Sequence, residues 1–359
     1  MLLRRRISEI ASQVKADISA SPEVKKVIGP AKKDQFLFPS GSKMLNLACS
    51  DFVHGAFATG KVVNLIGDSS SGKTLLALSS LAEMSHNPDF NEYRLIFDDA
   101  EEALEFDIEK LFEKETKDRI ELIRPSNTIE QFYGNVLKAV SMGDPFVYIL
   151  DSFDALTAEA EIKRSLEYEK EKEDKSGSYK TEKSRMMSEM LRVIKGKIRQ
   201  TNSLLLIISQ TRDNIGFGAM FQPKVRSGGK ALKFYSSHEI WLAVGKKETK
   251  RDVEVGNLVY AKLTKNKLTG KRREVTFPIF YEYGADDITS CIDFLVAQQA
   301  WKKVKGGIDS DGFFDICSRN KLITQIEKEG LQRELFKRTQ EEWDLMEKSL
   351  SLNRTKKWI

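Results

Sequence analysis

The chain has 359 residues, enough for two to three domains with a large core. Hydrophobic residues make up 40% and charged residues 31% of it, a balance that excludes a collagen-like, wholly disordered or membrane-embedded protein. The net charge is +5, and its two most basic segments are residues 211–233 and 262–273. Concentrated positive charge favours binding of a polyanion, with a pair of solvated basic surfaces as the alternative.

Residues 1–20 are predicted to form a short amphipathic helix, because apolar residues recur there at spacings of three or four. A linker is expected to follow, roughly over residues 21–42. The opening MLLRRRISEI is basic but has no apolar run behind it, so we expect a cytoplasmic rather than a secreted protein. The three cysteines lie far apart, which favours reduced thiols and no metal cluster.

Four short hydrophobic runs follow, at residues 62–67, 94–99, 146–151 and 204–209. Each is nearly continuous in hydrophobicity, as expected for parallel strands that are covered on both faces. A later group within residues 239–281 alternates more, so we expect antiparallel strands that extend the same sheet. From about Ile288 the pattern is mostly helical and charged. The prediction is an α/β fold, with residues 1–37 as N-terminal helix and linker, 38–286 as the core with a mixed, mainly parallel sheet, and 287–359 as a small α-rich C-terminal domain.

The strongest motif is GDSSSGKT, which lies between the run at 62–67 and a helical pattern. It fits a P-loop, in which glycines let backbone N–H groups surround phosphates at a helix N-terminus. Lys73 is expected to reach the β- and γ-phosphates, and the Thr74 hydroxyl to bind Mg²⁺. The residues expected to bind ATP here are Gly67, Asp68, Ser69, Ser70, Ser71, Gly72, Lys73, Thr74 and Leu75.

A second acidic element is Asp151, at the end of the run FVYILD. An acid at the tip of a buried strand beside a P-loop is expected to hold Mg²⁺ together with Thr74. The next residue is Ser152 and not a glutamate, so the base that activates water must come from elsewhere. The segment FDDAEEAL offers Asp99, Glu101 and Glu102.

With these motifs in this order, the chain resembles the RecA recombinases, the DNA strand-exchange proteins of the bacterial RecA and phage UvsX type. The resemblance covers roughly residues 38–284 and rests on motifs that occur in order. Besides GDSSSGKT these are FPSGSKMLNLA, DAEEAL, LDSFDALTAEAEI, SRMMSEMLR, QTNSLLLIISQTR, GGKALKFY and KNK.

The resemblance implies roles for further residues. Glu101 matches the catalytic base, and Gln210 the glutamine that senses the γ-phosphate and signals to the DNA loop. Lys265 and Lys267 match lysines that reach a neighbouring subunit's ATP, much as an arginine finger does. Tyr281 lies where the family places an aromatic ring against adenine.

The resemblance also places two DNA-binding loops. The second spans residues 211–229, where basic residues suit phosphates and apolar ones suit bases. The residues expected to bind DNA are Arg212, Ile215, Gly216, Phe217, Met220, Phe221, Lys224, Arg226, Gly228 and Gly229. The first loop is expected between residues 161 and 185, but its long, nearly neutral segment 163–183 departs from the family, and no residue is assigned there.

The expected function is that of an ATP- and Mg²⁺-dependent recombinase that forms a helical filament on single-stranded DNA and exchanges strands with duplex DNA in recombination and repair. The expected partners are both forms of DNA, further copies of the chain, a single-strand binding protein and a loader, and no membrane. The basic end NRTKKWI replaces the acidic tail of bacterial relatives and favours a phage- or prophage-type member. The alternatives are a DNA-stimulated ATPase that acts as a regulatory or damage-signalling platform without strand exchange and, more distantly, a hexameric helicase or clock-type ATPase.

Overall fold

The structure is a computed structural model and describes residues 36–163, 179–213, 224–226, 229–352 and 354. The expected N-terminal helix lies outside these residues. The helices are α2 Lys43–Ser50, α3 Lys73–Ser85, α4 Ile108–Arg119, α5 Ile129–Ser141, α7 Tyr179–Gln200, α8 Gly229–Tyr235, α9 Asp287–Ala297, α10 Arg319–Glu329 and α11 Gln332–Ser349, with 3₁₀ turns η1 Pro88–Phe90 and η2 Phe153–Ala155. The strands are β1 Leu37–Phe38, β2 Phe57–Ala58, β3 Lys61–Gly67, β4 Arg94–Asp99, β5 Ile120–Leu122, β6 Phe146–Asp151, β7 Leu204–Asp213, β8 Lys224–Arg226, β9 His238–Lys250, β10 Val253–Asn266, β11 Glu274–Phe280, β12 Gly284–Ala285, β13 Lys302–Val304 and β14 Gly307–Asp309.

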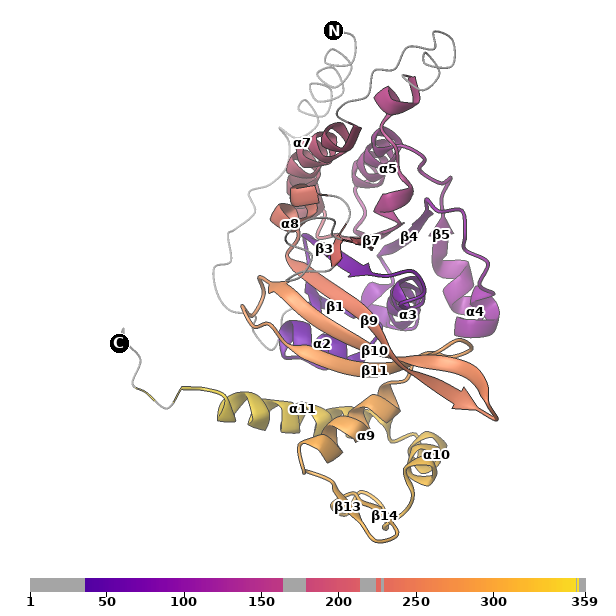
Figure 1. Cartoon of the computed structure of the whole chain (residues 1–359), viewed down its shortest axis with the longest axis vertical. Helices are drawn as coiled ribbons and strands as arrows, with labels where there is room; N and C mark the ends of the chain where they lie inside the picture. Colours follow the sequence, from indigo (N-terminus) through magenta and orange to yellow (C-terminus); the bar gives the residue numbers. More distant parts are fainter. Residues whose placement is uncertain (1–35, 164–178, 214–223, 227–228, 353, 355–359) are drawn as a thin grey trace. The chain divides into compact units, whose positions relative to one another are not determined.

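One large sheet organises the described residues, with strand order β12-β11-β10-β9-β3-β7-β6-β4-β5 and β8 paired to β7 (Figure 1). The strands from β9 through β3 to β5 are parallel, and β10, β11 and β12 continue the sheet in antiparallel pairs. This confirms the predicted α/β class with a mixed, mainly parallel sheet. Because β3, which precedes the P-loop, runs parallel to β7, β6 and β4, these strands all end on the edge where the P-loop begins.

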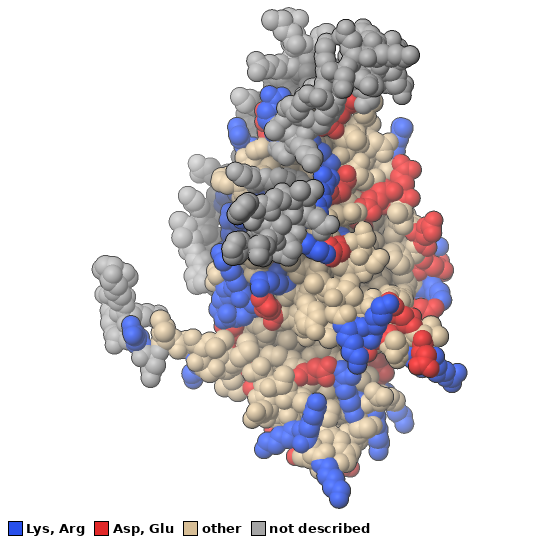
Figure 2. All heavy atoms as spheres, in the orientation of Figure 1, with Lys and Arg blue, Asp and Glu red and all other residues tan. Residues whose placement is uncertain are grey.

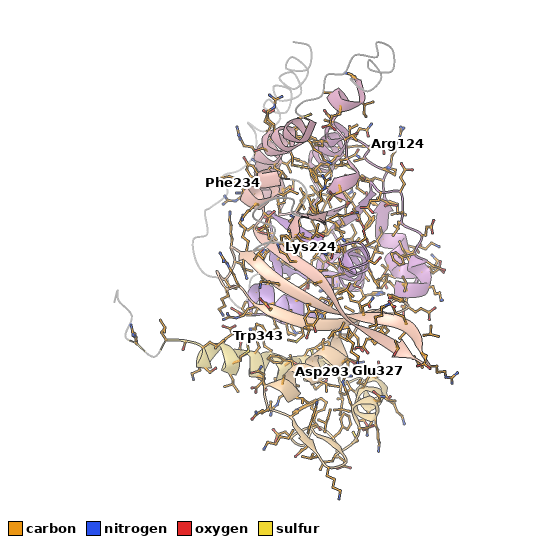
Figure 3. The ribbon with its side chains drawn as sticks, in the orientation of Figure 1. Arg124, Lys224, Phe234, Asp293, Glu327 and Trp343 are labelled. Carbon is orange, nitrogen blue, oxygen red and sulfur yellow. The ribbon has the colours of Figure 1, made fainter. Side chains whose placement is uncertain are left out.

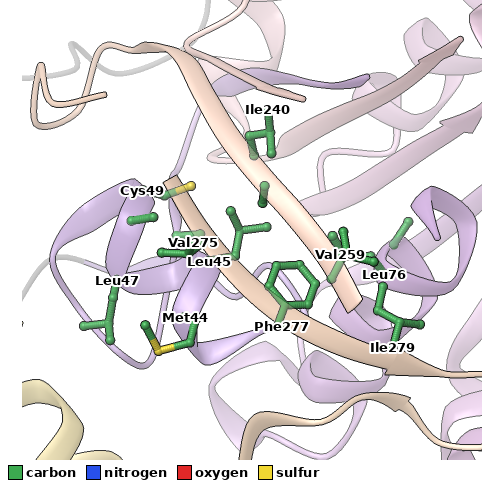
Figure 4. Close-up of a cluster of buried hydrophobic side chains, with 14 of the residues drawn as sticks. Met44, Leu45, Leu47, Cys49, Leu76, Ile240, Val259, Val275, Phe277 and Ile279 are labelled. Carbon is green, nitrogen blue, oxygen red and sulfur yellow. The ribbon is translucent and has the colours of Figure 1, made fainter. Parts of the chain in front are cut away.

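Alternate residues of the central strands enter two separate cores, which explains their continuous hydrophobicity. On one face Val63, Leu65 and Phe97 pack with α2, α3 and α9. On the other face Val62 and Ile96 pack with α5, α7 and α8. Figure 4 shows part of the first core, in which side chains of α2 lie near Val275 and Phe277 of β11, and Ile279 lies beside Val259 and Leu76.

The chain before the P-loop differs from the sequence-based expectation. The linker was expected roughly over residues 21–42 and the core from residue 38, and residues 38–42 are buried, so they belong to the core. Leu37 and Phe38 form β1 and pair with β2, and the Phe38 ring is fully buried beside Phe90 and Tyr93. The aromatic rings bury enough apolar area to hold this segment against the core.

The segment after residue 286 contains helices α9, α10 and α11, and also the hairpin β13–β14, which the helical pattern did not predict. The expected boundary falls at Asp287, the first residue of α9, and a separate domain stays a prediction, because Ile288 and Trp343 belong to the same buried cluster as the core. Helix α11 contacts the core through Trp343, labelled in Figure 3, whose Nε1 donates to Asp51 Oδ1 at 3.2 Å. Gln340 reinforces this contact, since its Nε2 donates to the Asp51 carbonyl at 2.9 Å.

None of the helices in the described part of the chain has the length and apolar composition that a membrane crossing requires. Cys49, Cys291 and Cys317 are buried free thiols. On the face drawn in Figure 2, most visible Asp and Glu side chains lie on the right half, whereas Lys and Arg side chains occur on both sides.

Candidate functional site

The P-loop connects β3 to α3 and adopts a backbone that its small residues permit. Gly72 is the N-cap of α3 with φ 83°, and Ser70 has φ 60°. A side chain at Gly72 would adopt this conformation only under strain, and its Cβ would lie 2.8 Å from Ile279 Cδ1. The loop therefore needs glycine at this position to present its N–H groups at the helix N-terminus.

A cavity of about 480 Å³ adjoins this loop. Six of the nine expected P-loop residues line it, and Gly67, Asp68 and Ser69 are not among them. Tyr281 also lines it, together with Asn257 and Phe106, which the sequence motifs did not single out. The lining consists of Ser70, Ser71, Gly72, Lys73, Thr74, Leu75, Ala103, Phe106, Asn257, Val259, Ile279 and Tyr281.

Tyr281 is oriented by two polar neighbours at the entrance of the cavity. Asn257 Nδ2 donates to its hydroxyl at 2.9 Å, and the hydroxyl donates to Glu254. The hydrogen bond to Glu254 raises the pKa of Tyr281 above its ordinary value. The Tyr281 residue is 43% exposed and lines the cavity, which leaves surface for contact with a planar group.

Lys73 is buried at the base of the P-loop. Its Nζ donates to the backbone carbonyl of Asp68 at 2.6 Å and lies 3.4 Å from Ser71 Oγ. Burial lowers the pKa of the Lys73 ammonium, and the carboxylates of Asp151 and Glu101 oppose this effect. A buried ammonium whose hydrogen-bond partners are a carbonyl and a hydroxyl gains from any anion that enters the loop.

Thr74 and Asp151 meet at the floor of the site, where Thr74 Oγ1 donates to Asp151 Oδ2 at 2.5 Å. Burial raises the pKa of Asp151 to about 6, although the Thr74 hydroxyl and Lys73 act in the opposite direction. A carboxylate and a hydroxyl are the oxygen donors that Mg²⁺ uses alongside substrate phosphates. The donor chemistry therefore fits the expected ion.

Glu101 lies beside Asp151, because its N–H donates to the Asp151 carbonyl at 3.1 Å. Its Oε1 accepts from the Ser152 hydroxyl and, at 2.8 Å, from Gln210 Nε2. The ends of β4, β6 and β7 thus bring Glu101, Ser152 and Gln210 into one network. Ser152 orients the Glu101 carboxylate, a role that became visible only with the fold.

The other two candidates for the base have different surroundings. The Asp99 carboxylate accepts from the N–H groups of Ala103 and Leu104, at 3.3 and 2.9 Å. Asp99 therefore stabilises the turn after β4. Glu102 has φ 51°, and its N–H donates to the Asp99 carbonyl at 3.0 Å. Among the three, Glu101 is the one joined to both Ser152 and Gln210.

The expected second DNA loop begins and ends on strands. Residues up to Asp213 belong to β7, and β8 pairs with them, so that Arg212 lies opposite Val225 and Asp213 opposite Lys224. Gly229 is the first residue of α8. Ile215, Gly216, Phe217, Met220, Phe221 and Gly228 lie outside the described residues, and Arg226 is described only as part of β8.

Two acidic side chains hold the basic residues at the start and end of this loop, and neither was anticipated. Arg212 lies 3.3 Å from Asp154 Oδ1, while Asp154 Oδ2 accepts from the backbone N–H of Gln210 at 2.7 Å. Lys224, labelled in Figure 3, forms an ion pair with Asp68. Both acids are distant in sequence from their partners, so no local pattern could have identified these contacts.

Lys265 and Lys267 lie away from this chain's own P-loop. Ala261 of β10 pairs with Leu242 of β9, and Leu242 pairs with Gly67 at the end of β3. Lys265 is four residues further along β10, about 13 Å in the strand direction. Lys265 Nζ donates to the carbonyls of Lys233 and Phe234 in the last turn of α8. These lysines are therefore at the opposite end of the strands from the cavity.

Comparison with known proteins adds the relationship of the chain to a family. The model of the RecA N-terminal domain matches residues 17–286, more than half of the chain. Protein RecA of Ehrlichia ruminantium is 31% identical over 258 residues, which cover 72% of this chain and 67% of that protein. Protein RecA of Leptospira meyeri is 33% identical over 67% of this chain and 58% of its own length, and that of Amycolatopsis mediterranei 33% over 74% and 71%. A match of this extent, together with the sheet and the P-loop, shows that the chain belongs to the RecA family.

Proposed function

We propose that this protein is an ATP-dependent DNA recombinase, which assembles on single-stranded DNA as a filament and exchanges strands with a homologous duplex. The observation that carries the proposal is the network at the ends of β4, β6 and β7. It joins Glu101 to Gln210, and Gln210 is followed directly by the residues that begin the second DNA loop. A change at the nucleotide can therefore reach the loop through one side chain.

In this proposal the residues of the site divide the chemistry of ATP hydrolysis. The P-loop N–H groups and Lys73 bind the phosphates, and Tyr281 stacks on the adenine. Thr74 and Asp151 would hold Mg²⁺, which neutralises phosphate charge when bound. Glu101 accepts a proton from the attacking water, and Ser152 keeps its carboxylate oriented.

The DNA-binding part of the proposal rests on charge and composition. Arg212, Lys224 and Arg226 flank a glycine-containing segment that carries aromatic residues. Such a combination suits the sequence-independent binding of a single strand by backbone charge and base stacking. Lys265 and Lys267, which lie away from this chain's own cavity, would complete the ATP site of an adjacent subunit. This head-to-tail arrangement repeats without closing and produces a filament.

The test is steady-state ATP turnover with and without single-stranded DNA, for the wild type and for Glu101→Gln. We expect strong stimulation by DNA in the wild type. Loss of a general base should lower kcat by about 10²–10⁴-fold, while DNA binding in the presence of ATP persists. Glu102→Gln, which removes the same charge from the neighbouring residue, should retain most of the turnover.

Two further outcomes separate the alternatives. An ATP turnover rate that is the same with and without single-stranded DNA would refute the coupling between the nucleotide site and DNA, and with it the proposed recombinase function. DNA-stimulated turnover without joint-molecule formation, in a strand-exchange assay with homologous duplex, would leave the regulatory DNA-stimulated ATPase as the function.

A further inference from the structure

Gln210 and the first two residues of the second DNA loop contact three acidic side chains. Gln210, Thr211 and Arg212 are consecutive in β7, and their side chains contact Glu101, Asp68 and Asp154 in turn. Gln210 accounts for one link between ATP and DNA. The contact of Asp68 is a separate one, because Asp68 belongs to the P-loop itself.

Asp68 uses both carboxylate oxygens to hold the base of the loop. Oδ1 accepts from the Thr211 hydroxyl and Oδ2 from the Lys224 ammonium. These hydrogen bonds, with that of Lys224 as the larger, lower the pKa of Asp68. At the same time the backbone carbonyl of Asp68 accepts from Lys73 at 2.6 Å. One residue therefore contacts the phosphate-binding lysine through its backbone and a DNA-loop lysine through its side chain.

We propose that Asp68 restrains the second DNA loop in the nucleotide-free protein by occupying Lys224, and that a bound nucleoside triphosphate weakens this restraint. The proposal rests on the function proposed above and adds a regulatory contact to it. Lys224 cannot pair with Asp68 and with a DNA phosphate at full strength at once, so Asp68 competes with DNA. A triphosphate beside Asp68 repels its carboxylate and draws Lys73 from its carbonyl, which lowers the cost of releasing Lys224.

The size of the effect follows from the exposure of the pair. The side chains of Lys224 and Asp68 are 48% and 47% exposed, so water screens their attraction. Exposed ion pairs of this kind correspond to a change in affinity of at most about fivefold. The restraint is thus weak enough for DNA to overcome and strong enough to measure.

The experiment measures the affinity of a fluorescent single-stranded oligonucleotide without nucleotide and with a non-hydrolysable ATP analogue. The variants are Asp68→Asn, Lys224→Met and the double variant. We expect Asp68→Asn to tighten nucleotide-free binding about threefold to fivefold and to have little effect with the analogue. In the Lys224→Met background the same change should have no effect, because the restrained cation is absent.

The double variant separates restraint from a general charge effect. Tightening by Asp68→Asn that persists in the Lys224→Met background would overturn the proposal, as would unchanged or weaker binding by Asp68→Asn alone. Asp118→Asn is the matched control, since it removes the same charge from the exposed Lys114–Asp118 pair on α4. It should leave DNA affinity unchanged, and equal tightening by this variant would also overturn the proposal.

The same data distinguish failure of this inference from failure of the proposed function. Suppose that the wild type binds DNA and that its ATP turnover responds to DNA. If Asp68→Asn then leaves the DNA affinity unchanged, only the proposed restraint is refuted. If the wild type binds no single-stranded DNA, either without nucleotide or with the ATP analogue, both proposals fail. Melting temperatures of all variants, compared with the wild type, identify any variant that has lost its fold.

Discussion

The contact between α11 and the core depends on Glu347, and its removal should destabilise the protein measurably. Glu347 accepts from Arg273 Nε at 2.6 Å and from Arg273 Nη2 at 2.8 Å. It also lies 2.8 Å from Lys271 Nζ, and Lys271 in turn pairs with Asp51 at 2.6 Å. The network thus connects α11 to the segment before β11 and to the end of α2.

The expected magnitude follows from burial. The Glu347 side chain is 12% exposed and those of Lys271 and Arg273 are 32% and 27% exposed. Exposed ion pairs contribute up to about 1 kcal/mol, whereas loss of one partner of a buried pair costs about 3–5 kcal/mol. For this intermediate case we expect Glu347→Gln to lower the free energy of unfolding by about 2 kcal/mol, equivalent to a fall in Tm of about 3 °C.

The assay is denaturant unfolding followed by tryptophan fluorescence, because Trp343 is buried on the same helix. The hydrogen bonds from Arg273 lower the pKa of Glu347. Its contribution is therefore complete above the unfolded-state pKa of about 4.3 and is lost as the pH falls through the lower folded-state pKa. The difference between wild type and variant should narrow below that pH.

The control is Glu341→Gln, which removes the same charge from an exposed position of α11 and should cost little. Equal stability of Glu347→Gln and Glu341→Gln at pH 7 would refute the reasoning. It would mean that the apolar contacts of Trp343 alone hold the helix.

Two further predictions concern the subunit interface and acid stability. If Lys265 and Lys267 act on a neighbouring subunit, an inactive Lys73→Ala protein and an inactive Lys265→Ala/Lys267→Ala protein should complement each other. An equal mixture of the two should recover up to about a quarter of wild-type turnover, because random head-to-tail assembly forms that share of complete sites. A mixture that is as inactive as its components would contradict this prediction. His238 is 1% exposed, and burial lowers its pKa to about 4. The stabilisation from its neutral form is complete above pH 6.5 and is lost as the pH falls towards 4, so the free energy of unfolding should fall by about 2 kcal/mol between pH 7 and pH 5. His238→Phe should remove this fall. His86→Gln, at an exposed histidine, should retain it.

The sequence revealed those parts of the fold whose signal is local. The strands β3, β4, β6 and β7 were recognisable because burial on both faces requires continuous apolar runs. The P-loop was recognisable because its glycines and lysine have fixed spacing. The hairpin β13–β14 was missed because its strands have three residues each and every residue of β13 is exposed, so the segment is too short to show hydrophobic alternation.

The polar partners within the site could not be predicted in the same way. Asp68 and Lys224 are separated by 156 residues, and only the pairing of β7 with β8 brings them together. In the sequence, Ser152 was noted only because a glutamate is absent at this position. Its contact with Glu101 depends on β4 and β6 ending side by side. Sequence reasoning identified the groups that are proposed to carry the chemistry and missed the side chains that contact them.

The alternation of contacts at the end of β7 limits which changes of chain length the protein can accept. One residue inserted or deleted just before Gln210 would turn each following side chain to the opposite face. The Thr211 hydroxyl would then face Glu101, and a basic side chain would face the P-loop. Insertions after Asp213 leave this order unchanged. Related chains should therefore vary in length beyond residue 213 and keep a constant number of residues from the start of β7 to that position, a boundary that single-residue insertion scanning would locate.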